Sequence, residues 1–96
     1  MSQSRDAFVK KMKAKLDEWN AEIDKLEAQS RQKGADVQAD YQKRIADLKD
    51  KRQEARQKLS KVQEAGESAW EDLKSGVELA ADALGNALKS ARARFQ

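Results

Sequence analysis

The stretch VKKMKAKLDEWNAEIDKL, residues 9–26, carries the pattern that decides the fold. Its large apolar side chains recur every seven residues in two series, Val9, Leu16 and Ile23 in one and Met12, Trp19 and Leu26 in the other, three positions further on. Two such series occupy the a and d positions of a coiled coil, where they form one narrow apolar seam along a helix. The stretch therefore predicts an all-α fold.

The same seam continues past Gly34, with Ser30 filling the first series before it. The next interface residues that we predict are Val37, Tyr41, Ile45, Leu48, Leu59 and Val62, with Ala55 among them. A turn would normally reset the phase of the pattern, so we predict one helix over residues 4–63, weakened at Gly34 by about 1 kcal/mol relative to alanine. The alternative is an antiparallel three-helix bundle with turns at Gly34 and Gly66, in which Asp36 caps the middle helix.

Two features of this helix allow more than one interpretation. Arg52 falls in the seam, where its aliphatic stem can pack while its charged head reaches water. Alanines also recur every seven residues opposite the seam, at Ala7, Ala14, Ala21, Ala28 and Ala35. They fit a solvent-exposed face of high helix propensity, or else a thin second stripe for close helix contact.

A turn is predicted at residues 64–68, followed by an amphipathic helix over residues 69–94. Gly66 suits the end of a helix, and Ser68 with Glu71 forms a capping-box sequence. The last helix has a broader apolar face, partly spaced by eleven residues: Trp70, Leu73, Val77, Leu84, Leu88 and Phe95. Gly76, Leu79 and Ala83 add a second apolar edge. We predict a single helical domain, residues 1–96, built as an elongated helical hairpin or an oligomeric bundle.

The composition argues against catalysis. The chain has no histidine and no cysteine, which removes the commonest acid–base group, the commonest metal ligand and every thiolate. We expect no enzyme, no cofactor and no metal. No segment is long and apolar enough to span a bilayer, and the first residues lack a signal-peptide core, so the expected location is cytoplasmic.

Three segments together resemble a known group of proteins: LDEWNAEI at residues 16–23, the charged run at residues 41–61, and AWEDLKSGV at residues 69–77. They are similar to small bacterial coiled-coil proteins of the uncharacterised stress-response type. That resemblance covers most of the chain and implies a helical protein without catalytic residues. Gly34 departs from its more uniformly helical middle.

We therefore expect a non-enzymatic structural or interaction protein that self-associates through the seam residues and the last helix, as a homo-oligomer with any other protein partner unknown. The alternative is a peripheral binder of lipid or granule surfaces that uses the last helix. We favour it less, because acidic residues lie on the polar face of that helix. Nucleic acid is not expected, since Asp50 and Glu54 interrupt the basic residues Lys49, Lys51, Arg52, Arg56, Lys58 and Lys61.

Overall fold

The structure is a computed structural model that describes residues 3–95, and this part of the chain forms three α-helices. They are α1 (Gln3–Ser30), α2 (Ala35–Glu64) and α3 (Trp70–Arg94). The described residues include no strand. The predicted all-α fold is thus confirmed.

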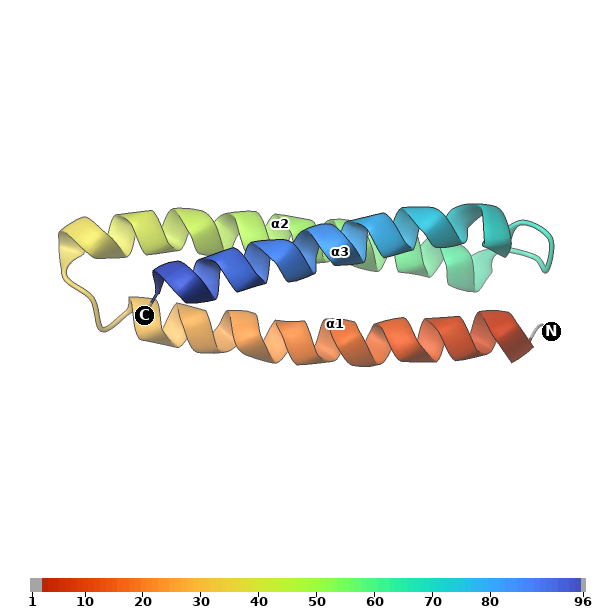
Figure 1. The fold of residues 1–96 in the computed structure, drawn as a ribbon, viewed down its shortest axis with the longest axis horizontal. Helices are drawn as coiled ribbons and strands as arrows, with labels where there is room; N and C mark the ends of the chain where they lie inside the picture. Colours follow the sequence, from red (N-terminus) through yellow and green to blue (C-terminus); the bar gives the residue numbers. More distant parts are fainter. Residues whose placement is uncertain (1–2, 96) are drawn as a thin grey trace.

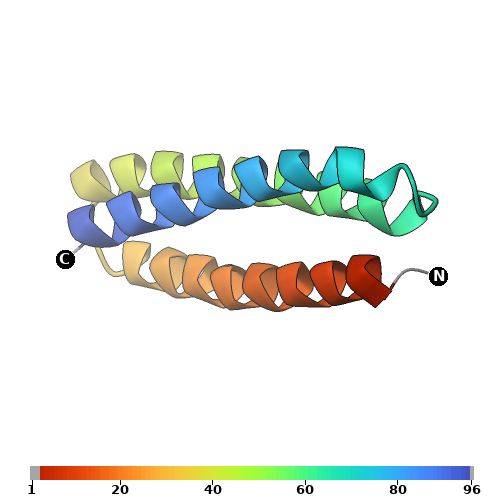
Figure 2. The ribbon, with the colours of Figure 1, turned by 45° about the vertical axis from the view of Figure 1, so that its right-hand side comes forward.

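The three helices lie side by side and alternate in direction along one long axis (Figure 1 and Figure 2). The bundle measures 51 × 18 × 17 Å, so it is about three times as long as it is wide. The turn between α1 and α2 lies at one end, beside the carboxyl end of α3, and the turn between α2 and α3 lies at the other (Figure 1). A chain of three such helices can cover its own apolar stripes.

The continuous helix predicted over residues 4–63 is wrong, and the three-helix alternative describes the architecture. The chain leaves helical geometry at residues 31–34, and Gly34 becomes the N-cap of α2 with φ −65° and ψ 160°. Asp36 is not the cap; it lies in the first turn of α2. Folding back gives the seam of α1 a partner within the same chain, which offsets the few helical hydrogen bonds given up at the turn.

The second turn falls where the sequence predicts it, but the predicted capping box is wrong. The N-cap of α3 is Ala69, in helical conformation, and its side chain makes no capping hydrogen bond. The carbonyl oxygen of Gly66 accepts hydrogen bonds from the amides of Ala69 and Trp70, at 3.1 and 3.2 Å. This backbone turn satisfies two amides that a capping side chain would otherwise satisfy. Ser68 therefore lies within the turn and does not cap α3. The charges at the two ends of α3 suit the helix dipole, with Glu71 and Asp72 at the start and Arg92 and Arg94 at the end.

The core runs the length of the bundle between the three helices. Its fully buried larger side chains are Ile23, Leu48, Val62, Val77, Leu84 and Leu88. Ala55, Ala81 and Ala91 fill the spaces where the helices come close. By contrast, the alanines opposite the seam, from Ala7 to Ala35, are all exposed within the bundle.

Candidate interaction surface

Most residues of the predicted interface pack against one another inside this single chain. The structure buries Val9, Met12, Leu16, Ile23, Leu26, Tyr41, Ile45, Leu48, Leu59, Val62, Trp70, Val77, Leu84, Leu88 and Phe95. Trp19 is half-buried. Two members stay outside: Val37 is 47% exposed and Leu73 is 36% exposed. The surface on offer to a partner is therefore different from the predicted seam.

The most exposed large apolar side chain is Leu79, on the outer side of α3, with 70% of its surface accessible. Gly76 and Ala83 lie three and four residues from it along the helix, and Leu73 lies three residues before Gly76. We call these four residues the α3 edge. Positions three and four apart adjoin on a helix, so each of these residues adjoins the next. Each step of three turns about 60° around the helix, so the edge runs obliquely across α3. The sequence indicated Gly76, Leu79 and Ala83 as a second apolar edge, yet the predicted interface left them out. The eleven-residue spacing favoured the face that is buried.

The apolar face of α3 that a lipid surface would use is turned into the bundle. Aromatic residues at its two ends contact other helices. The ring centroids of Trp70 and Phe8 of α1 are 6.0 Å apart, and Phe95 stacks on Tyr41 of α2 with a centroid distance of 3.6 Å. Lys74 lies near both Phe8 and Trp70, with its Nζ 5.7 and 5.9 Å from the two centroids. In this conformation the face is occupied by α1 and α2.

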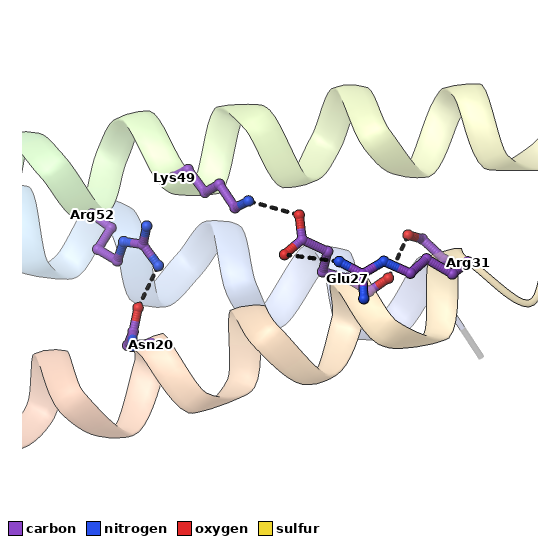
Figure 3. Close-up of polar contacts among 6 residues, drawn as sticks. Asn20, Glu27, Arg31, Lys49 and Arg52 are labelled. Atoms are coloured by element: carbon purple, nitrogen blue, oxygen red, sulfur yellow. Dashed lines mark hydrogen bonds and ion pairs between the residues drawn. The ribbon is translucent and has the colours of Figure 1, made fainter.

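Polar contacts join α1 to α2 beside the core (Figure 3). Lys49 Nζ donates to Glu27 Oε2 at 2.6 Å, and Arg52 Nη1 donates to Asn20 Oδ1. The hydrogen bond from Lys49 lowers the pKa of Glu27 below its usual 4.5, with help from the charges of Lys49, Arg31 and Arg52 and against partial burial. Glu27 is therefore anionic at neutral pH and forms an ion pair with Lys49 across the two helices.

Arg52 occupies its seam position at a cost. Its stem packs and its Nη1 finds Asn20, but its Nε is buried with no hydrogen-bond partner among the described residues. An unpaired buried donor loses its hydration without compensation. The buried hydroxyl of Ser30, also in the seam, is by contrast satisfied, since it donates to the carbonyl of Glu27 at 2.6 Å.

Several basic residues of α2 form ion pairs with acidic ones. Lys51 contacts Asp47 at 2.9 Å and Lys58 contacts Glu54 at 3.5 Å, while Lys49 reaches Glu27 on α1. Interspersed carboxylates offset the positive charge along this helix. A coherent cationic stripe is what nucleic-acid backbones need.

Residues 3–95 include no group of three or more acidic side chains placed to hold a metal ion. Nor does any helix within this range have the length and apolar character needed to cross a membrane. Comparisons with protein-family models, with curated proteins and with solved structures found no match.

Proposed function

We propose that this chain is a non-enzymatic interaction protein that acts by helix-to-helix association along the α3 edge, with a second copy of itself as the first partner to test. The observation that supports the proposal is the exposure of Leu79, at 70%, on a helix whose other large apolar side chains are mostly buried. Exposed apolar residues that adjoin one another mark contact surfaces more often than isolated ones do.

The small side chains of the edge favour a helix as the partner. Ala83 is exposed beside Leu79, and its small side chain lets another backbone approach, so a leucine from the partner can lie next to Leu79. Burying one exposed leucine contributes up to about 2 kcal/mol. A contact of two edges buries only a few such side chains, and association itself costs at least about 4 kcal/mol. We therefore expect weak association, with a Kd on the order of 0.1 mM or weaker.

Sedimentation velocity over a concentration series tests this proposal. Leu79→Glu places a charge in the contact and should abolish the concentration dependence of the sedimentation coefficient. Ala14→Glu makes the matched change on the exposed face of α1 and should leave it intact. The proposal fails if the unmodified protein stays monomeric up to millimolar concentration, or if both variants behave alike.

The biological setting in the proposal is a stress-related role in the cytoplasm. It is supported by the resemblance of residues 16–23 and 69–77 to stress-response coiled-coil proteins. Quantifying the protein in its cells before and after osmotic and heat stress tests this part. Unchanged abundance under both conditions would remove the stress role and leave the association proposal untouched.

A further inference from the structure

We propose that two copies of this chain exchange α1. In the exchanged dimer the turn at residues 31–34 straightens, α1 and α2 join into one helix, and α1 of each copy packs on α2 and α3 of the other. The partner is a second copy of this chain. The surfaces involved are those that already hold the monomer together, so the inference does not depend on the α3 edge.

The geometry of the turn makes the change small. The amides of Gln32 and Lys33 donate to the carbonyls of Gln29 and Ser30, at 3.1 and 3.2 Å, so the chain is still coiled as it leaves α1. At Gly34, φ is −65°, a helical value, and only ψ, at 160°, is extended. None of the described residues has a positive φ, and the chain has no proline. Hence no side chain or ring in the turn forbids a helix.

The apolar series that crosses the turn stays in phase. Val9, Leu16, Ile23 and Ser30 are buried in the bundle, and the next member, seven residues on, is Val37. In the hairpin Val37 is 47% exposed. A continuous helix places Val37 on the same face as the buried members, because a seven-residue step returns nearly to the same side of a helix. The one member of the series that the monomer leaves out is thus the one that exchange would use.

The contacts between α1 and α2 are arranged almost symmetrically about that residue. Glu27 and Lys49 form an ion pair across the two helices, and Arg5 Nη1 donates to the carbonyl of Ala65 at 2.6 Å. The two members of each pair lie at similar distances along the chain from Val37. Two continuous helices that keep these contacts between copies would cross antiparallel near Val37. They would then bring the two Val37 side chains together at the two-fold axis.

The remaining two helices provide the surface that receives α1. Tyr41 of α2 and Phe95 at the end of α3 stack face to face, and this contact between α2 and α3 does not involve a side chain of α1. Side chains of α1 can form the same contacts with the other copy. One example is Glu22, whose carboxylate lies 2.9 Å from Arg92 Nη1 on α3. Because the interactions of α1 that break within a chain form again between chains, the balance between the two forms depends on the turn and on protein concentration.

Two neighbouring substitutions move that balance in opposite directions. Gly34→Ala fits the monomer, since a Cβ there meets nothing within 4 Å. It also raises the equilibrium constant for a helical conformation of residues 31–34 roughly fivefold in each chain. We expect the dimerisation constant to rise roughly thirtyfold for the two turns of a dimer. Ala35→Pro occupies the first position of α2, which accepts proline, and Gly34 already has the extended ψ that a residue before proline adopts. A proline at this position would break a continuous helix, so this variant should stay monomeric.

The experiment refolds each variant from urea at high protein concentration and separates the products by size exclusion with light scattering. All variants carry Leu79→Glu, so association through the α3 edge does not contribute. To identify the dimer, Glu27→Cys and Lys49→Cys chains, each with Gly34→Ala, are refolded together and treated with a short bismaleimide. The natural sequence has no cysteine, so cross-links form only at the two introduced positions, and a mixed dimer reports the 27–49 pair.

Exchange predicts covalent dimers that contain one chain of each kind, and their loss when Ala35→Pro is added. The melting temperature of the Ala35→Pro monomer should match that of the unmodified chain, which shows that the hairpin has folded. A Gly34→Ala protein that remains monomeric would overturn the inference. So would a dimer without mixed cross-links, or a dimer that persists with Ala35→Pro. None of these outcomes bears on the Leu79→Glu test of the α3 edge.

Discussion

Gly85 sets how closely α1 and α3 approach each other. A Cβ at this position would lie 3.2 Å from Cζ2 of Trp19, which is tighter than ordinary van der Waals contact. The missing methyl group lets the indole ring lie directly on the backbone of α3, and Trp19 is half-buried there. Gly76, on the same helix, has no such neighbour, since a Cβ there would meet only Cδ of Lys58 at 3.9 Å.

This difference gives a matched pair of substitutions. Gly76→Ala should stabilise the protein by about 1 kcal/mol, the usual gain from replacing glycine within a helix. Gly85→Ala should gain nothing or destabilise, because the ring of Trp19 must move. Urea unfolding measures both free energies. In a protein that carries Trp19→Leu, adding Gly85→Ala should recover most of the stabilisation expected from replacing glycine. Equal stabilisation by Gly76→Ala and Gly85→Ala in the unmodified protein would contradict this account of Trp19.

At the scale of the helix, α3 separates two leucines with opposite roles. Leu84 is completely buried, while Leu79 is 70% exposed. Leu84→Ala should destabilise the bundle by about 2–5 kcal/mol, since it removes core contacts and leaves a cavity. Leu79→Ala should change the unfolding free energy by less than about 0.5 kcal/mol. Thermal or urea unfolding of both variants at low protein concentration provides the measurement, and similar losses in the two would mean that α3 packs by another face.

The elements differ in how far the sequence could predict them. Seven-residue spacing located the buried side chains of α1 and α2, from Val9 to Val62, because burial of a stripe is a property of each helix. It could not show which chain covers the stripe. The turn at Gly34 was only the alternative prediction, because the pattern keeps its phase across residues 31–34 and no residue there requires a non-helical backbone. The cap of α3 was missed for another reason, since the backbone of Gly66 replaced Ser68.

At the scale of the whole molecule, length is the property that best distinguishes the folded-back chain from one with a continuous helix. The Cα radius of gyration of the bundle is 15.5 Å and its length is 51 Å. A helix over residues 4–63 would be about 90 Å long. Small-angle X-ray scattering of the dilute protein should therefore give a maximum dimension far below about 90 Å. A particle of that length at the lowest concentration would mean that the chain does not fold back on itself.

The described ends of the chain lie at opposite ends of the bundle, with the start of α1 far from the end of α3 (Figure 1). A force that pulls on these two ends is consequently directed along the helix axes, so α1 and α3 are sheared past each other rather than peeled apart one layer at a time. Once the layers slip, the 51 Å bundle can lengthen to roughly 300 Å of extended chain. Under tension the bundle would keep its length at small forces and extend several-fold at larger ones.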